Sequence, residues 1–140
     1  APAIDNAADL HYQIDKVQMG FFKYLLDQLD QYTTPTGTLL DDCVAMWTND
    51  LGTGIGHSYR NMPYLIAGSG GGYLRQGQYI DARDTGTASG NYVGHGQMFN
   101  TILNAVGVGE ADGAPVTDFG HKGSATHNQA PGGEISGMKA

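Results

Sequence analysis

The stretch that decides the fold is Leu39–Gly72, LLDDCVAMWTNDLGTGIGHSYRNMPYLIAGSGGG. Within it, a polar, glycine-rich segment separates two short apolar runs, Cys43–Thr48 and Met62–Ala67. Apolar runs of this length, bounded by turn residues and with little polar alternation, are typical of strands that are buried on both faces of a sheet. We therefore predict two core strands joined by a polar loop.

The polar segment between the two runs contains Asp50, His57, Tyr59 and Arg60. It follows the carboxyl end of the first predicted strand, and in open α/β sheets the loops at that edge form the ligand-binding crevice. A carboxylate and an imidazole seven residues apart on glycine-rich backbone can turn onto one metal ion. Asp50 and His57 are therefore the candidate ligands, and this donor pair favours zinc, manganese or iron over calcium. Asp50 could instead cap the following turn, and a lone histidine in a glycine loop, such as His57, is often a hydrogen-bonded surface residue. Zinc sites normally have at least three protein ligands, so the others would come from elsewhere.

The sequence predicts one helix on each side of this centre. Over residues 9–32, apolar residues recur at intervals of three and four, at Leu10, Ile14, Val17, Phe21, Leu25 and Leu29. This periodicity predicts an amphipathic helix that packs across a sheet face. A second helix is predicted over 95–107, with His95 at its start and Gly107 as its cap.

Glycine-rich segments predict the loops. The run Gly68–Gly72 follows a strand, but no Lys-Ser/Thr pair comes after it, so a flexible loop is expected rather than a phosphate cradle. Residues 73–80 alternate as a small hairpin does. Residues 109–140 are expected to form an extended tail. Together these features predict a single α/β module over residues 1–140, with a partial sheet of buried strands packed by two helices.

Composition restricts the partners. The chain of 140 residues has seven basic and fourteen acidic side chains and a formal net charge of -7. It therefore lacks the surplus of Lys and Arg that displaces counterions from a nucleic acid. No apolar run approaches the roughly 20 residues that cross a bilayer, so no transmembrane segment is expected. Cys43 is the single cysteine and lies in an apolar run, which predicts a buried thiol and no internal disulfide.

Other polar residues give weaker signals. His121 and His127, six residues apart in a glycine-rich segment, lack the spacing of a dedicated metal motif. Arg60 could hold an anionic group through its planar fork or pair with one of the many carboxylates. Ser58 directly follows His57, and adjacent positions do not meet as nucleophile and base, so no Ser-His-Asp arrangement is supported.

Three phrases carry a resemblance to a known family: GTLLDDCVAMWTNDLG, HSYRNMPYLIAGSGGG, and NTILNAVGV followed by DFG. Over Leu10–Gly120 the chain resembles the carboxyl-terminal part of a family of secreted bacterial proteins of unassigned function. That family is distantly similar to the alkaline phosphatase and sulfatase superfamily, in which a strand ends in a metal-binding Asp and a further metal-binding His precedes the next core strand. The resemblance implies these roles for Asp50 and His57, with a divalent ion, zinc foremost. Leu51 stands where the superfamily often has its second ligand.

Two functions of different kinds follow from this resemblance, both in a periplasmic or extracellular setting. In the superfamily, an earlier half of the fold supplies the nucleophile and the remaining ligands, and 140 residues leave no room for it. The favoured function is an accessory or structural subunit of a larger extracytoplasmic assembly, in which other protein chains complete the sheet. The alternative is part of a metal-dependent phosphate or sulfate ester hydrolase whose nucleophile lies outside this chain.

Overall fold

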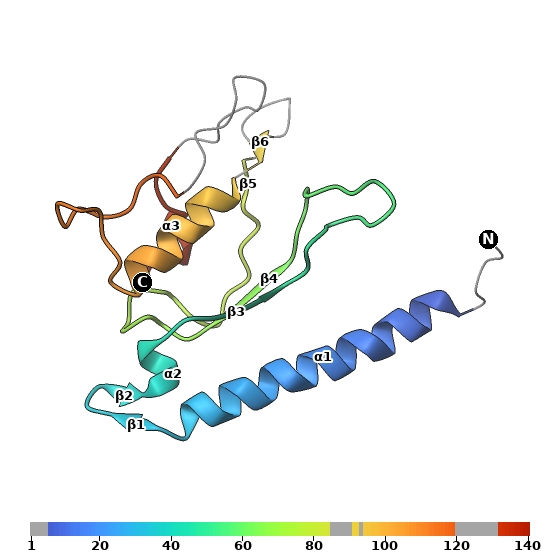
Figure 1. Cartoon of the computed structure of the whole chain (residues 1–140), viewed down its shortest axis with the longest axis horizontal. Helices are drawn as coiled ribbons and strands as arrows, with labels where there is room; N and C mark the ends of the chain where they lie inside the picture. Colours follow the sequence, from blue (N-terminus) through green and yellow to red (C-terminus); the bar gives the residue numbers. More distant parts are fainter. Residues whose placement is uncertain (1–5, 85–90, 93, 120–131) are drawn as a thin grey trace.

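The computed structural model describes residues 6–84, 91–92, 94–119 and 132–140 (Figure 1). In chain order the elements are α1 (Ala7–Asp30), β1 (Thr33–Thr34), β2 (Gly37–Thr38), α2 (Leu39–Asp42), β3 (Ala45–Thr48), β4 (Tyr64–Ala67), β5 (Arg83–Asp84), β6 (Asn91–Tyr92), α3 (His95–Ala105) and the 3-10 helix η1 (Ser136–Met138). Within these residues the strands pair two by two into antiparallel sheets, β1–β2, β3–β4 and β5–β6. The described chain is thus a mixed helix-and-strand fold, as the sequence predicts.

β3 and β4 are the two predicted central strands, but they run antiparallel, with Met46 opposite Ile66 and Trp47 opposite Leu65. The polar segment between them is therefore a hairpin loop and not a loop at the carboxyl edge of a parallel sheet. Met46 and Ile66 pack against the core, whereas the Leu65 side chain is 45% exposed. The prediction of strands buried on both faces is wrong, because the described chain covers this narrow sheet well on one face alone.

The hydrophobic core lies where the β3–β4 hairpin, α3 and the end of the chain meet. Its cluster of buried apolar side chains consists of Leu74, Met98, Ala105 and Met138. The N–H of Arg75 donates to the carbonyl oxygen of Met138 at 2.8 Å, and the N–H of Ala140 donates to that of Tyr73 at 2.9 Å. The end of the chain is thus anchored in the core.

These contacts correct two expectations. Residues 73–80 form no hairpin, because Leu74 pairs with Lys139 at the end of the chain and not within its own segment. The extended tail predicted over 109–140 is wrong for residues 132–140, which turn through η1 and bury Met138. Residues 120–131 lie outside the described part of the chain.

α3 begins at His95 and is capped at Gly107, as the sequence predicts. Gly107 has a positive φ of 76°, the left-handed conformation that glycine adopts without strain. Its N–H donates to the carbonyl oxygen of Asn104 at 3.1 Å, and the N–H of Val108 donates to that of Leu103 at 2.9 Å. These two bonds form a Schellman motif, which satisfies carbonyl groups at the helix end.

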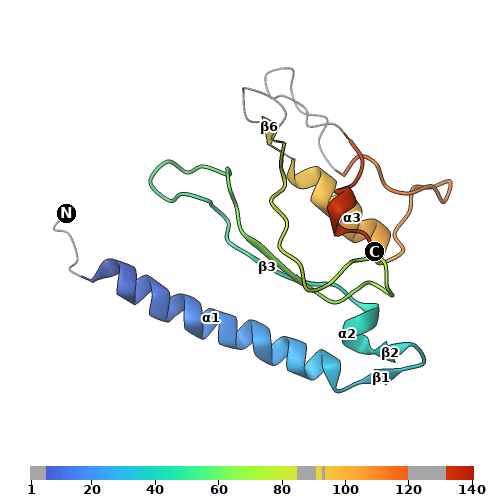
Figure 2. The ribbon, with the colours of Figure 1, turned by 180° about the vertical axis from the view of Figure 1, so that it is seen from behind.

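α1 is the predicted first helix, but it lies outside the core. No α1 residue is buried, and every residue from Asn6 to Gln18 is exposed. Figure 1 and Figure 2 show α1 running beside the rest of the chain, joined to it at its carboxyl end through the β1–β2 hairpin and α2. The expected packing of this helix across a sheet face is therefore not formed within the described residues. None of the described helices is both long and apolar enough to span a bilayer.

The glycine run after β4 is a packed turn and not the flexible loop expected from its composition. Gly68 is buried with a φ of 90°. A Cβ atom at this position would collide with the carbonyl oxygen of Cys43 and lie 2.6 Å from that of Leu40. The N–H of Gly70 donates to the same Cys43 oxygen at 3.1 Å. Glycine is required here because the end of β4 lies directly against the end of α2.

Candidate functional site

The predicted metal ligands Asp50 and His57 lie in the hairpin loop between β3 and β4. In this loop the N–H of Gly52 donates to the carbonyl oxygen of Ser58 at 2.8 Å, and the N–H of Ser58 donates to that of Thr53 at 3.1 Å. These bonds close the tip of the loop. His57 lies within the closed tip, whereas Asp50 precedes it, so the two side chains occupy different parts of the loop.

The loop does not by itself fit a metal ion. Asp50 and His57 are both exposed, as are Tyr59 and Arg60. Asp50 precedes the first residue of the closed tip, Gly52, by two positions. Among the described residues, no three His, Cys, Asp or Glu side chains form a group that could hold a metal. A zinc site at Asp50 and His57 stays a prediction, and it requires ligands from other polypeptide.

His95 has a structural role at the start of α3. Its Nδ1 atom lies 3.1 Å from the hydroxyl oxygen of Tyr64, and the two rings meet edge to face at 5.5 Å between centroids. Partial burial raises the pKa of Tyr64, so its hydroxyl stays protonated at neutral pH. The pair joins β4 to α3. His121 and His127 lie outside the described residues.

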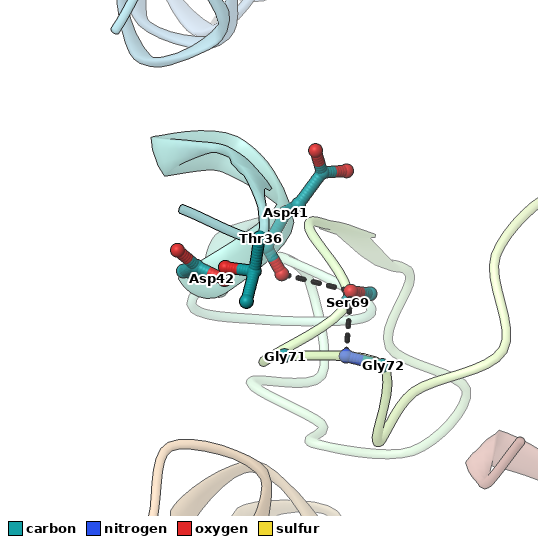
Figure 3. A pocket seen from close by; sticks show the side chains of 6 residues that line it. All are labelled: Thr36, Asp41, Asp42, Ser69, Gly71 and Gly72. Carbon is teal, nitrogen blue, oxygen red and sulfur yellow. Dashed lines mark hydrogen bonds between the residues drawn. The ribbon is translucent and has the colours of Figure 1, made fainter. Parts of the chain in front are cut away.

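A hollow of about 390 Å³ lies at the junction of the β1–β2 hairpin, α2 and the glycine run (Figure 3). Its lining residues are Thr36, Asp41, Asp42, Ser69, Gly71 and Gly72. The Asp41 carboxylate accepts from the N–H of Thr38 at 2.8 Å and completes a capping box at the start of α2. Asp42 accepts from the hydroxyl of Thr36 at 2.7 Å. Hydrogen bonds from the hydroxyls of Thr34 and Thr36 lower the pKa of Asp42.

Ser69 joins the two sides of this hollow. Its hydroxyl donates to the carbonyl oxygen of Asp41 at 2.8 Å and accepts from the N–H of Gly72 at 2.9 Å (Figure 3). The Ser69 hydroxyl therefore holds α2 against the glycine run, whereas the carboxylates of Asp41 and Asp42 bond to Thr38 and Thr36. The signal in the sequence was the Thr38-x-x-Asp41 capping pattern, which marks a helix start.

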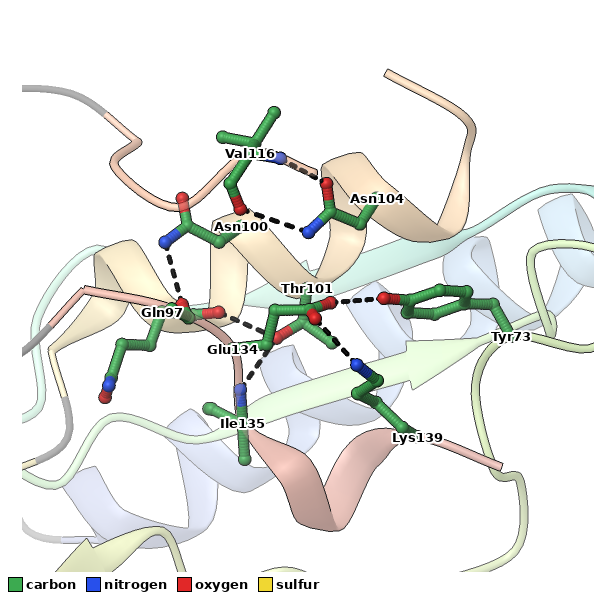
Figure 4. Close-up of polar contacts among 10 residues, drawn as sticks. Tyr73, Gln97, Asn100, Thr101, Asn104, Val116, Glu134, Ile135 and Lys139 are labelled. Carbon is green, nitrogen blue, oxygen red and sulfur yellow. Dashed lines mark hydrogen bonds and ion pairs between the residues drawn. The ribbon is translucent and has the colours of Figure 1, made fainter. Parts of the chain in front are cut away.

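Polar side chains of α3 hold two loops against the core (Figure 4). The side-chain amide of Asn104 donates to the carbonyl oxygen of Val116 at 3.1 Å, and its own oxygen accepts from the N–H of Val116 at 2.7 Å. This paired contact replaces the strand partner that the backbone of Val116 lacks. It fixes the loop after α3, in which the Val116 side chain is buried.

Asn100 and Thr101 make the matching contacts to the end of the chain. Among the described residues they are the most completely buried side chains, with 2% and 0% exposure. The amide of Asn100 donates to the carbonyl oxygen of Gly133 at 2.8 Å, and the hydroxyl of Thr101 accepts from the N–H of Ile135 at 2.9 Å. The sequence does not predict these contacts, because polar side chains on a short helix are more often exposed.

Glu134 forms the centre of a charged cluster beside these contacts (Figure 4). It accepts from the Tyr73 hydroxyl at 2.5 Å and from the Lys139 ammonium at 2.7 Å. Burial disfavours charge on Glu134, but hydrogen bonds from Lys139, Tyr73 and Asn104 outweigh it and lower the pKa of Glu134. The hydrogen bond to Glu134 raises the pKa of Tyr73 and the pKa of Lys139. The cluster ties the end of the chain to the segment after the glycine run.

Replacing Glu134 by glutamine is expected to destabilise the protein in a pH-dependent way. The folded-state pKa of Glu134 lies below its ordinary value of 4.5, so the carboxylate contributes stability above that value. This contribution is lost as the pH falls through the lowered folded-state pKa. At pH 7 the substitution should reduce the free energy of unfolding by about 1–2 kcal/mol, as for a hydrogen bond to a charged group. Urea denaturation of both proteins measures the difference.

The difference between wild type and Glu134→Gln should shrink when the measurement is repeated at about pH 3, below the ordinary pKa of 4.5, because the unfolded chain then binds a proton at Glu134 that the folded chain binds less readily. Glu110→Gln, at an exposed turn, serves as the control and should leave stability nearly unchanged at both pH values. An undiminished difference at the lower pH would show that the charge of Glu134 has no part in anchoring the end of the chain.

Comparison with family models finds no match for this chain. No curated protein and no solved structure matches it either. The resemblance to the alkaline phosphatase and sulfatase superfamily therefore stays a hypothesis, carried by the sequence phrases alone.

Proposed function

We propose that this chain is an accessory or structural module of a larger extracytoplasmic assembly, in which other polypeptide covers the surfaces that the chain leaves open. The observation that carries the proposal is α1, a helix of 24 residues with an apolar stripe and no buried residue. Its large apolar side chains on one face are 45% to 71% exposed. Contiguous apolar surface of this kind marks a binding surface, because a soluble monomer rarely leaves it in water.

The β3–β4 hairpin supports the same proposal. Each strand has four residues, and within the described chain neither strand pairs with a further one. A two-stranded hairpin is marginally stable in water, and unpaired edges readily accept another strand. The cross-strand pair of Trp47 and Leu65 lies on the face away from the core and leaves Leu65 half-exposed. This face offers apolar surface to a partner.

The small core points in the same direction. Buried apolar residues among those described are Ala45, Leu74, Met98, Ala105, Val116 and Met138. Two of these six residues are alanines, so the apolar surface that the described residues bury completely is small, and little of it stabilises the chain by itself.

The extracytoplasmic setting and the descent from a metal-dependent hydrolase fold rest on the sequence resemblance. In the alternative function, Asp50 and His57 provide part of the ligand set of a divalent ion, which stabilises negative charge on a phosphate or sulfate ester. The nucleophile and further ligands would then belong to another polypeptide. The noncatalytic function is preferred because the exposed apolar surfaces are features of the chain itself.

Light scattering and hydrogen exchange on the isolated chain test the proposed function. If α1 needs a partner, one of two results is expected. Either light scattering shows that the chain associates, or the amide hydrogens of residues 7–18 exchange with solvent much faster than those of α3. Exposed helix that is not packed opens readily, whereas core helix is protected. A compact monomer in which α1 is as protected as α3 would contradict the proposal.

Metal analysis separates the proposed function from the hydrolase alternative. We expect the isolated chain, dialysed against zinc, to retain less than one ion per chain, because Asp50 and His57 are too few ligands for a tight site. His57→Ala is expected to leave the association state unchanged. His11→Ala, at another exposed histidine, controls for weak surface binding. Stoichiometric zinc that is lost in His57→Ala alone would favour the hydrolase function.

A further inference from the structure

We propose that the partner of α1 is the same helix of a second copy of this chain. This inference rests on the proposed function and names the polypeptide that covers α1. The surface concerned is called the α1 seam and consists of Leu10, Ile14, Val17, Phe21 and Tyr24, with Leu25 beside it. These side chains are 45% to 71% exposed, and Phe21 is the most exposed of them.

The spacing of the α1 seam indicates that its partner is a helix. Its residues follow one another at intervals of four, three, four and three, an average of 3.5 residues. This is the repeat that keeps one narrow seam facing a second helix in a left-handed coiled coil. A helix that covers a sheet instead carries a wider stripe with the 3.6-residue period of a straight helix. Two α1 helices would interlock along this seam.

The α1 seam is not the face that α1 turns toward its own chain. The half-buried apolar side chains of α1 are Met19, Phe22, Leu26 and Leu29. With 100° of rotation per residue, their mean direction lies roughly 140° from that of the seam. α1 therefore has two apolar faces, of which the described chain covers one partly and leaves the other open.

The charges around the α1 seam allow a second copy to approach. The residues that flank it along the helix include no Asp, Glu, Lys or Arg; they are His11, Gln13, Gln18 and Gly20. Lys16 and Lys23 lie on the far side of the helix, and Lys23 already binds the Asp27 carboxylate at 2.8 Å. A two-fold interface brings identical surfaces together, so flanks without carboxylates avoid the repulsion that the net charge of -7 would otherwise cause. A strongly basic or acidic partner would find no matching charge there.

The amino-terminal half of α1 needs such a contact most. Residues 6–18 are exposed on every side, so this half of the helix lacks the tertiary packing that supplies most of the stability of helices in proteins. Leu10, Ile14 and Val17 all lie in this half. The exposed side chains of the seam offer on the order of 600 Å², close to the roughly 800 Å² per partner of a standard interface. Pairing through the seam would therefore stabilise the helix and supply most of a dimer contact.

Sedimentation analysis of the full chain and two matched variants tests the inference. The variant V17E/F21E places carboxylates in the seam, and the control K16Q/K23Q makes the same change in net charge on the far side of α1. We expect the wild-type mass to rise with concentration toward twice the 14.8 kDa of the chain. V17E/F21E should weaken the dimer by about 100-fold or more, since two central apolar contacts are lost, and K16Q/K23Q by less than about 3-fold.

A cysteine cross-link gives an independent positive signal. Val17 is the middle residue of the seam. It would therefore lie opposite Val17 of the second copy if the two helices pair in parallel and in register, and also if they pair antiparallel with Val17 at the centre. In a Cys43→Ser background, V17C should form a covalent dimer on mild oxidation at low micromolar concentration. K16C in the same background should form at least about 10-fold less, because its side chain points away from the seam.

Three results would overturn the inference: a wild-type monomer at about 100 μM, a dimer that V17E/F21E leaves intact, or equal cross-linking of V17C and K16C. Hydrogen exchange then decides whether the proposed function fails as well. A monomer whose residues 7–18 exchange fast excludes the second copy alone, since a different polypeptide could still cover α1. A monomer with a protected α1 overturns both.

Discussion

Replacing Gly68 by alanine is expected to destabilise the fold by about 3 kcal/mol, because two costs act at one position. The backbone φ of 90° lies in a region that L side chains rarely adopt. The new Cβ atom would also collide with the carbonyl oxygen of Cys43 and lie 2.6 Å from that of Leu40. Neither oxygen can move without breaking the junction of α2 and β4. Urea unfolding followed by the fluorescence of Trp47, the single tryptophan, measures the loss.

Gly71→Ala is the matched control for this substitution. Gly71 also has a positive φ, 68°, but a Cβ atom there would meet no atom within 4 Å. Its substitution should cost only the backbone preference, about 1 kcal/mol. Equal destabilisation by the two substitutions would mean that the close approach at Gly68 is unimportant, and that the glycine run is the flexible loop its composition predicts.

The two long helices could be predicted from the sequence because a helix closes its hydrogen bonds locally. The three- and four-residue periodicity located α1, and Gly107 marked the end of α3 through its ability to adopt a positive φ. The partner of α1 could not be predicted in the same way. The periodicity shows that apolar faces are to be covered, but only the fold shows which face of α1 is left open, with Leu10, Ile14 and Val17 exposed.

Strand pairing was less predictable because it depends on residues far apart in the sequence. The apolar runs located β3 and β4 correctly, yet a run of apolar residues does not reveal whether its partner is parallel or antiparallel. Leu74 pairs with Lys139, 65 residues further on, so the alternation over 73–80 suggested a hairpin partner that the structure does not use. Pairing between residues this far apart leaves no pattern in the sequence around either residue.

The sequence predicted where in the chain the candidate site lies, but not how its side chains are arranged in space. The sequence placed Asp50 and His57 in one loop, but the backbone bonds of Gly52 and Ser58 decide that His57 lies in the closed tip and Asp50 before it. The contacts of Asn104 were missed for a related reason. A side-chain amide that pairs with a distant backbone, here that of Val116, resembles an exposed helix residue until the fold is known.

Leu74→Ala is expected to remove about 3 kcal/mol from the free energy of unfolding, through lost burial and the cavity left behind. Leu74 is 4% exposed and packs in the cluster that joins Met98 of α3 to Met138 near the end of the chain. The loss is a large part of the 5–15 kcal/mol that stabilises an ordinary domain. Thermal and urea unfolding of the isolated chain measure it, and the end of the chain should become more sensitive to proteases.

The same substitution at Leu65 tests whether the core is as localised as the structure indicates. Leu65 lies on the open face of β4 and is 45% exposed, so Leu65→Ala should cost less than about 1 kcal/mol in the isolated chain. If that face is covered in the assembly, Leu65→Ala would weaken binding while leaving the isolated chain nearly as stable as before. Similar destabilisation by both substitutions would show that the β3–β4 face is already packed within the chain, and that the hairpin has no open face left for a partner.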